Sequence, residues 1–346
     1  MNVVAVFNQK GGVGKTTISV NLAVTLASMG YKTVFIDMDF QGDGTRQLWQ
    51  GETPNLTVYD LLARRCCAEE AAVETGFPNL SVVASSRKLS LIEAGSDTAG
   101  WRQTELKDNG FSRSQVDFII IDCPPSLGRL AANALTAANF LIVPVTPTAF
   151  AIEGMKRTLD IYQAVRAWLN PDLRHYRICL SMMDDKPVSR VLAAEIVSAQ
   201  GEHLLSTKIP YDADVNKAAT YKTPCMLYNP ESDFASAMTS LAVDMIGTLG
   251  LELSDKAIEG MRESIGTKHQ ELASNFKGIA EFNVESAKPL ASAKELPPGQ
   301  RRNGHAMNGH PTTGQGEPRS MASRFKPFVV GSIIGAAFGF FAGAQM

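Results

Sequence analysis

The sequence lacks an excess of charge of either sign. It has 33 lysines and arginines against 35 aspartates and glutamates, so no global basic surface marks a nucleic-acid binder and any DNA contact must come from a local patch. Cysteine is also scarce. The five cysteines are odd in number and mostly lie in apolar runs, which favours a reducing compartment with buried thiols over a disulfide framework. No leader-like segment precedes the first apolar run, so we expect no signal peptide.

At 346 residues the chain is long enough for one large α/β domain with appendages. Its most informative stretch is rich in glycine. An apolar run at residues 3–7, which predicts a buried strand, precedes it, and apolar residues at helical spacing follow it over 18–29. Strand, glycine-rich turn and helix together are the context of a phosphate-binding loop. The loop and its helical continuation comprise Lys10, Gly11, Gly12, Val13, Gly14, Lys15, Thr16 and Thr17.

The chemistry of such a loop is binding of a nucleoside triphosphate. Glycines allow consecutive backbone N–H groups to face phosphate oxygens, and the N-terminus of the next helix adds a positive dipole. We expect Lys15 to reach the β- and γ-phosphates and the Thr16 hydroxyl to ligate Mg²⁺. The pattern G-x-x-x-x-G-K-[ST] is not met letter for letter, because Lys10 stands where its first glycine would be. ATP and Mg²⁺ are the predicted ligands, and the nucleotide-binding residues are Gly11, Gly12, Val13, Gly14, Lys15, Thr16 and Thr17.

This deviant Walker A motif resembles that of the ParA/MinD family of P-loop ATPases, and the resemblance covers residues 1–250. It implies a doubly wound, mostly parallel α/β sheet with helices on both faces, and a slow, partner-stimulated hydrolysis of ATP. In that family a lysine at the position of Lys10 reaches across a nucleotide-sandwich dimer to the partner's ATP. Its role is that of an arginine finger supplied in trans, which offsets charge on the γ-phosphate. The resemblance therefore implies a homodimer on ATP binding, with Lys10, Lys15 and Asp39 as catalytic residues.

Two further segments carry aspartates at the ends of apolar runs. Asp37 ends the run at 33–37 and Asp39 follows it, at the sheet edge where α/β ligands bind; a surface turn is the alternative interpretation. The segment is similar to the family's D-x-D-P-Q-G-N, with Phe40 for proline and Asp43 for asparagine. This similarity implies that Asp39 orients the attacking water and that Asp37 helps to hold Mg²⁺ through water. Asp122 ends the run at 116–122, as in a Walker B motif, where it sets the Mg²⁺ shell.

Segments later in the chain contain candidate residues for contacts with the adenine base and with DNA. Residues 209–212 resemble a family loop beside the base, so Met183, Pro210 and Asp212 are candidates for adenine contacts, with an ordinary strand end as the alternative. DNA-binding members place basic residues near this loop, and a phosphate-contacting patch needs several of them. Scattered surface cations are the other interpretation. The candidates for the patch are Arg174, Arg177, Lys186, Arg190, Lys217 and Lys222.

Three appended segments follow residue 250. Apolar residues at mostly helical spacing predict a helical extension over 251–286. Residues 287–326 are rich in proline, glycine, asparagine and arginine, and predict a disordered linker. Residues 327–346 are uncharged, with glycine at every fourth position from 331 to 343, a spacing that lets membrane helices approach closely. We expect this last segment to insert in a membrane or to self-associate.

The leading interpretation is a ParA-type ATPase, closest to ParA/Soj partition proteins. It would form an ATP-dependent sandwich dimer, bind non-specific DNA, and segregate or position DNA or another large cargo until a ParB-like partner stimulates hydrolysis. One alternative is a MinD-like positioning ATPase anchored to the membrane through 327–346, and another is a nucleotide-binding scaffold with little turnover. A metal-cluster carrier of the wider superfamily is disfavoured because no C-x-x-C occurs. The expected location is the bacterial cytoplasm, at the nucleoid or the inner membrane.

Overall fold

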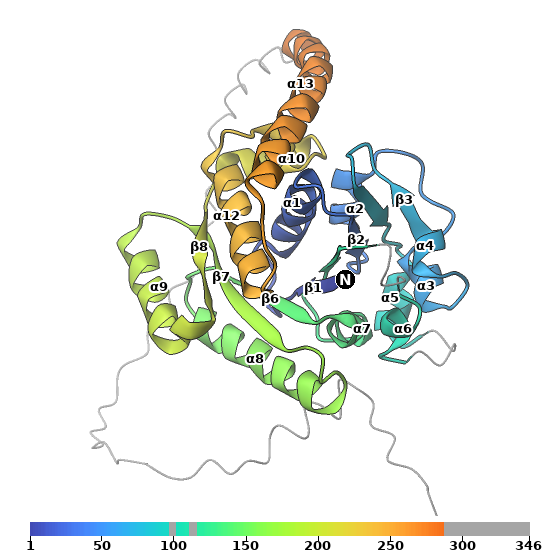
Figure 1. The fold of residues 1–346 in the computed structure, drawn as a ribbon, viewed down its shortest axis with the longest axis vertical. Helices are drawn as coiled ribbons and strands as arrows, with labels where there is room; N and C mark the ends of the chain where they lie inside the picture. Colours follow the sequence, from blue (N-terminus) through green and yellow to red (C-terminus); the bar gives the residue numbers. More distant parts are fainter. Residues whose placement is uncertain (97–101, 111–115, 287–346) are drawn as a thin grey trace, which may run out of the picture.

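The structure, a computed structural model of the chain, describes residues 1–96, 102–110 and 116–286. Eight strands form one sheet in the order β3-β4-β2-β5-β1-β6-β7-β8 (Figure 1). Neighbouring strands are parallel except at one edge, where β3 pairs antiparallel with β4. The strands are β1 (Asn2–Val6), β2 (Thr33–Asp37), β3 (Ala72–Glu74), β4 (Leu80–Val83), β5 (Phe118–Asp122), β6 (Phe140–Val145), β7 (His175–Met183) and β8 (Leu204–Pro210).

Helices cover both faces of this sheet, and side chains of each strand alternate between the faces. In β1, Val3 and Ala5 join the apolar cluster on one face, whereas Val4 and Val6 join the cluster on the other. A sheet buried on both faces requires such continuously apolar strands. The first face is covered by α3 (Val58–Leu62), α4 (Ala68–Ala71), α5 (Leu89–Glu93), α6 (Glu105–Asp108), α7 (Arg129–Ala137), α8 (Ala151–Trp168) and α9 (Pro187–Gln200).

The opposite face carries α1 and the C-terminal helices. Residues of α1 (Lys15–Ser28), α11 (Cys225–Tyr228) and α12 (Asp233–Thr248) fill its apolar cluster, together with Ala218 from α10 (Ala213–Thr220). The short α2 (Asp43–Leu48) packs against α1 and β4, and a 3-10 turn (Gly201–His203) follows α9. The predicted fold class, α/β with a mostly parallel sheet and helices on both faces, is confirmed.

After α12, the chain continues as α13 (Asp255–Ser286). Its first half packs against α1 and α11, and both Met261 and Ile265 are 4% exposed, in keeping with the apolar spacing of the sequence. The predicted segments 287–326 and 327–346 lie outside the described residues. Within the described part of the chain, no helix combines the length and the apolar character needed to cross a membrane.

Candidate active site

The glycine-rich loop joins the end of β1 to α1 and has the backbone that the sequence predicts for it. Gly12 and Gly14 have φ angles of +72° and +85°, a left-handed region that side chains rarely adopt. Gly14 is the N-cap of α1, so the helix starts directly at Lys15. At Gly11 and Gly12 an added Cβ would meet nothing within 4 Å, which leaves the surface of the loop open. The loop therefore presents backbone N–H groups and a helix N-terminus to one space, as an anion site requires.

Lys15 folds back over this loop. Its side chain is largely buried, and its Nζ donates a hydrogen bond of 3.3 Å to the backbone carbonyl of Lys10. Burial lowers the pKa of Lys15, while the charges of Asp122, Cys123 and Asp39 oppose that shift. These acidic neighbours favour the charged ammonium form of Lys15.

Asp122, at the end of β5, has a buried oxygen without a partner. Its Oδ1 accepts a 3.1 Å hydrogen bond from the Ser19 hydroxyl, whereas its Oδ2 is buried and has no hydrogen-bond partner among the described residues. Burial raises the pKa of Asp122 well above its usual range, and nearby Asp37 raises it further; the hydroxyls of Thr16 and Ser19 oppose this shift. A buried, unpaired carboxylate oxygen is costly, and it fits a hard cation, for which the Thr16 hydroxyl is a second oxygen donor.

Asp37, at the end of β2, stands opposite Asp122 in the strand register but has different partners. Its Oδ2 accepts two 2.7 Å hydrogen bonds, from the backbone N–H and the hydroxyl of Thr45, and its Oδ1 accepts one of 3.2 Å from the Asp39 N–H. Burial raises the pKa of Asp37 to about 6, against the opposing effect of the Thr45 hydrogen bonds. The carboxylate of Asp37 thus organises the loop that follows it.

Asp39 lies on that loop and is only partly buried. Its Oδ1 accepts a 2.9 Å hydrogen bond from the Gln41 N–H. Its backbone carbonyl accepts two more, from the Ser85 hydroxyl at 2.5 Å and from the Gly42 N–H at 2.9 Å. The structure therefore brings Asp39, Lys15 and Asp122 to one edge of the sheet, at the carboxyl ends of β1, β2 and β5.

Lys10 lies at the rim of the same site. Its backbone N–H donates to Asn8 Oδ1 at 3.0 Å, and its Nζ donates to the Thr148 hydroxyl. Buried Asn8 is itself fixed by hydrogen bonds to the Pro144 carbonyl and from the Thr158 hydroxyl. Within the described part of the chain, no carboxylate comes within ion-pair distance of Lys10. Hydrogen bonds therefore fix the backbone at the start of the loop, whereas the Lys10 ammonium contacts a neutral hydroxyl.

A hollow beside α1 contains two of the three residues proposed to contact adenine. Pro210 and Asp212 line it, together with Gly14 and Thr17 of the loop region. Met183 does not line it; its carbonyl accepts the Tyr211 N–H at 2.8 Å, and its side chain packs on the core. The neighbouring Met182 lines the hollow instead, with a φ of +52°. Asp212 also caps α10 by accepting the Asp214 N–H at 2.8 Å.

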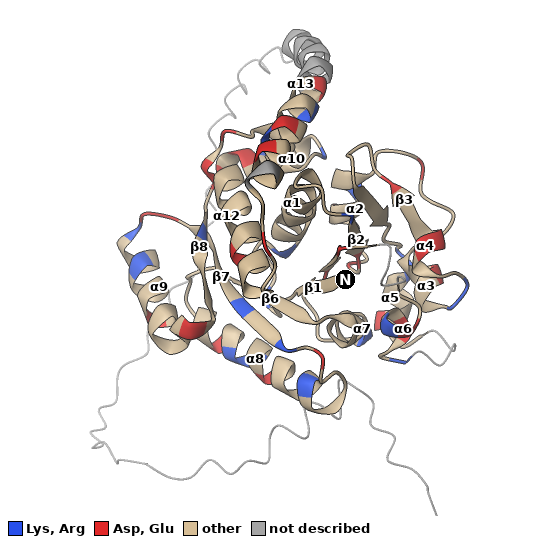
Figure 2. Cartoon of the chain, in the orientation of Figure 1, with Lys and Arg blue, Asp and Glu red and all other residues tan. Residues whose placement is uncertain are grey.

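The candidate DNA patch is largely neutralised within the chain. Figure 2 shows acidic residues beside basic ones in the segment that enters α9. Arg177, in β7, donates to a backbone carbonyl at 2.9 Å. Four of the six proposed cations form ion pairs: Arg174 with Asp172 (3.4 Å), Lys186 with Asp184 (2.6 Å), Arg190 with Asp185 (3.0 Å) and Lys217 with Asp214 (2.6 Å).

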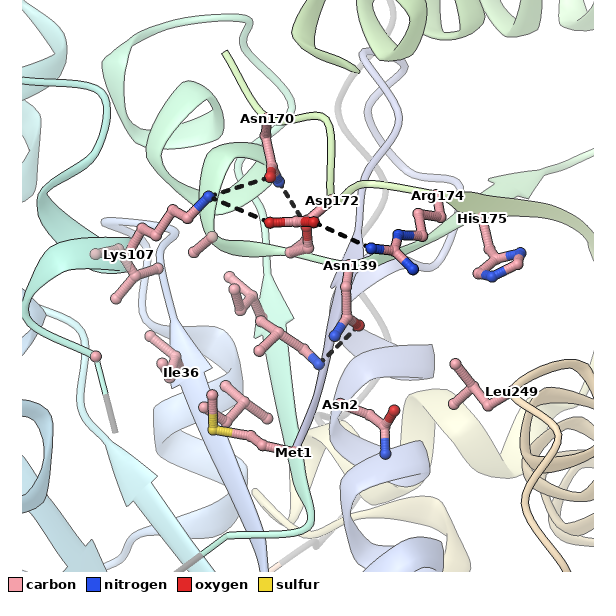
Figure 3. A pocket seen from close by; sticks show the side chains of 17 residues that line it. Met1, Asn2, Ile36, Lys107, Asn139, Asn170, Asp172, Arg174, His175 and Leu249 are labelled. Atoms are coloured by element: carbon pink, nitrogen blue, oxygen red, sulfur yellow. Dashed lines mark hydrogen bonds and ion pairs between the residues drawn. The ribbon is translucent and has the colours of Figure 1, made fainter. Parts of the chain in front are cut away.

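A cavity of about 550 Å³ opens at the amino ends of β1 and β7, and its lining does not include the phosphate-binding loop (Figure 3). The polar side chains at its rim form hydrogen bonds and ion pairs with one another and with the backbone. Lys107 approaches Asn170 and Asp172 at 3.4 and 3.9 Å, and Arg174 contacts Asp172. Asn139 accepts the Val3 N–H at 3.0 Å, and Asn170 donates to two carbonyls at the end of α7. This cavity is separate from the groups assembled at the carboxyl edge.

Comparison with known proteins agrees with this geometry. A family model described as an AAA domain matches residues 1–175. The chromosome partitioning protein ParA of Caulobacter vibrioides is 34% identical over 255 residues, which are 71% of this chain and 94% of that protein. The sporulation initiation inhibitor protein Soj of Bacillus subtilis is 34% identical over 246 residues, 70% of this chain and 97% of that protein. The chain belongs to the ParA/Soj family of partition ATPases.

Solved structures similar to this ParA-family chain hold nucleotides. Cobyrinic acid a,c-diamide synthase from Mycobacterium smegmatis, with bound ADP and magnesium, has a TM-score of 0.60 and 26% identity, and the match covers 73% of this chain and 98% of that one. A putative plasmid partition protein from Borrelia burgdorferi, bound to AMPPNP, has a TM-score of 0.62 at 21% identity, covering 71% and 99%. The second likeness shows the fold alone.

Sequence reasoning missed several residues of this ParA-family site. Ser19 lies one helical turn after Lys15 and Thr16, so its position on the loop side of α1 could have been read from helical spacing. Thr45 and Ser85 carry no such signal, because each reaches the site only through the packing of α2 and β4 against β2.

Proposed function

We propose that this chain hydrolyses ATP in a sandwich of two copies, and thereby positions or segregates DNA or another large cargo. The loop N–H groups and Lys15 bind the phosphates. Thr16 and the unpaired Asp122 oxygen would hold a magnesium ion, which would supply positive charge to neutralise the phosphates. Asp39 orients the attacking water, and Asp37 holds the loop that carries Asp39.

The position of Lys10 is the main observation in support of a dimer. Its ammonium lies at the rim on the neutral hydroxyl of Thr148, while Lys15 already occupies the inner side of the loop. Moving Lys10 to a new partner breaks one hydrogen bond and no ion pair. In the sandwich, each Lys10 offsets the charge that develops on the γ-phosphate bound by the other copy, an effect worth about 10³–10⁵ in rate for arginine fingers.

The named relatives support a role in partition. The first is described as a chromosome partitioning protein and the second as a sporulation initiation inhibitor protein. By this likeness we propose that the ATP-bound dimer binds DNA without sequence preference and that a ParB-like partner stimulates hydrolysis and release. Since four of the six candidate cations are ion-paired, the candidate patch of one copy offers little free positive charge. Binding to DNA phosphates therefore depends on the combined positive charge of two copies.

A dilution series tests the proposal. With ATP and Mg²⁺, light scattering should shift from the mass of one chain to that of two as the protein concentration rises, and hydrolysis per subunit should rise in parallel. A rate per subunit that stays constant on dilution, with a monomer throughout, would contradict the sandwich. DNA binding that needs ATP and weakens with salt supports partition; liposome binding without DNA binding would favour the membrane-anchored alternative.

A further inference from the structure

Two hydroxyls from outside the phosphate-binding loop hold the segment that carries Asp39. Thr45 belongs to α2, which follows that segment, and Ser85 lies two residues beyond the end of β4. Because β4 is the neighbour of β2, Ser85 lies beside the end of β2 where the two aspartates lie, and Thr45 reaches the same place from α2. We name the pair Thr45 and Ser85 the hydroxyl clasp.

The clasp closes a circuit of hydrogen bonds between the two aspartates. The Thr45 hydroxyl donates to Asp37 Oδ2 at 2.7 Å and accepts the Ser85 N–H at 2.9 Å. The Ser85 hydroxyl then donates to the Asp39 carbonyl at 2.5 Å. Asp39 returns to Asp37 through its own N–H, at 3.2 Å. Four residues from three segments thus fix one another.

Close packing of α2 on β2 makes this circuit possible. A Cβ added at Gly44 would lie 2.5 Å from the Phe35 ring and 3.3 Å from Asp37 Oδ2, so only glycine lets the helix come this near. The Thr45 N–H then reaches Asp37 at 2.7 Å. Ser85 is 9% exposed, so its hydrogen bonds are shielded from water, and a shielded bond restrains its partner more firmly than one in competition with solvent.

We propose that Thr45 and Ser85 are positioning residues for Asp39, and that the clasp fixes the orientation of the Asp39 carboxylate during hydrolysis. The inference rests on the proposed function, in which Asp39 orients the attacking water. Asp39 lies in a segment without regular structure, and its carboxylate has one hydrogen bond within the loop, from Gln41. Misplacement of a catalytic group by about 1 Å can cost about a hundredfold in rate, so the backbone restraint from Ser85 matters for turnover.

Two pairs of variants test the clasp in the full chain. Ser85→Ala removes the hydroxyl that holds the Asp39 carbonyl, and Ser86→Ala is its control, because the neighbouring Ser86 hydroxyl accepts only a local 3.3 Å hydrogen bond from Lys88. Thr45→Val keeps the shape of threonine without its hydroxyl, and Thr45→Ser keeps the hydroxyl. The measurements are kcat and KM for ATP, affinity for a fluorescent ADP analogue, and ATP-dependent dimer mass.

We expect Ser85→Ala and Thr45→Val to lower kcat about tenfold to a hundredfold with KM, ADP affinity and dimer mass near those of the wild type. Ser86→Ala and Thr45→Ser should retain turnover. Equal kcat for Ser85→Ala and the wild type would overturn the inference. So would a loss that appears equally in KM, ADP affinity and melting temperature, because that pattern marks a purely structural role. An inactive wild type would instead contradict the proposed function.

Discussion

Asp37 and Asp122 face each other across β2 and β5, both fully buried, yet only Asp122 has an oxygen without a hydrogen-bond partner among the described residues. In the sequence the two aspartates look alike, since each ends an apolar strand. In the structure Asp37 accepts three hydrogen bonds, one from Asp39 and two from Thr45, whereas one oxygen of Asp122 stays without a partner. The metal role of Asp37 stays a prediction, while the geometry favours Asp122 as the residue facing magnesium.

This difference predicts separate effects on magnesium. Asp122→Asn removes the charge of the open oxygen, so we expect about tenfold more Mg²⁺ to be needed for half-maximal ATP affinity, measured by titrating Mg²⁺ against a fluorescent ATP analogue. Asp37→Asn disturbs the loop of Asp39 instead, so it should slow hydrolysis and leave that midpoint near the wild-type value. Equal midpoints for Asp122→Asn and the wild type would refute the assignment of the open oxygen.

Mixing two inactive variants tests whether Lys10 acts in trans. Lys10→Ala should bind ATP without hydrolysing it, and Asp39→Ala should accumulate as an ATP-bound dimer. In a mixed dimer one site combines Asp39 with the other copy's Lys10. An equal mixture should therefore regain about a quarter of the wild-type rate, because half of the dimers are mixed and each has one intact site. A mixture as inactive as its parts would show that Lys10 acts within its own chain.

Thiol reactivity offers a test of the core that is independent of nucleotide. Cys67 is exposed, whereas the other four cysteines are buried. Burial raises the pKa of Cys179 and of Cys225 to about 12, so at neutral pH their reactive thiolate is scarce. We expect one fast-reacting thiol per native chain with Ellman's reagent, absent in Cys67→Ser, and all five in denaturant. Two or more fast thiols in the native protein would contradict the packing.

The strands and the phosphate-binding loop could be predicted from sequence because each is a local pattern. The apolar run before Gly11 and the helical spacing after Lys15 need no knowledge of the rest of the chain. The three-residue β3 has no such signature, and it forms only by pairing with β4. Met182, and not Met183, lines the hollow beside α1, and its φ of +52° at the end of β7 has no local signature in the sequence.

An exposed aromatic residue beside Thr148 marks the surface that the second copy should cover. Phe150 is 81% exposed at the N-cap of α8, with a φ of +65° that a phenylalanine rarely adopts. Such a conformation costs on the order of 1–3 kcal/mol and persists where the surrounding structure enforces it. The segment from Thr148 to Phe150 lies at the carboxyl edge of the sheet, next to the ammonium of Lys10. In the sandwich we expect the Phe150 ring to be buried against the other copy.

Phe150→Asn tests this contact without lowering stability, because asparagine tolerates the left-handed backbone and the ring is exposed in one copy. Burying a phenylalanine contributes about 1.5–3 kcal/mol and each variant dimer lacks two such rings, so the variant should need about a hundred to ten thousand times more protein to dimerise with ATP. The control is Trp168→Asn, which removes a ring of 76% exposure at the other end of α8. If both variants dimerise like the wild type in light scattering, Phe150 lies outside the interface. If both weaken equally, the effect comes from α8 as a whole; only a loss confined to Phe150→Asn places the second copy at the carboxyl edge.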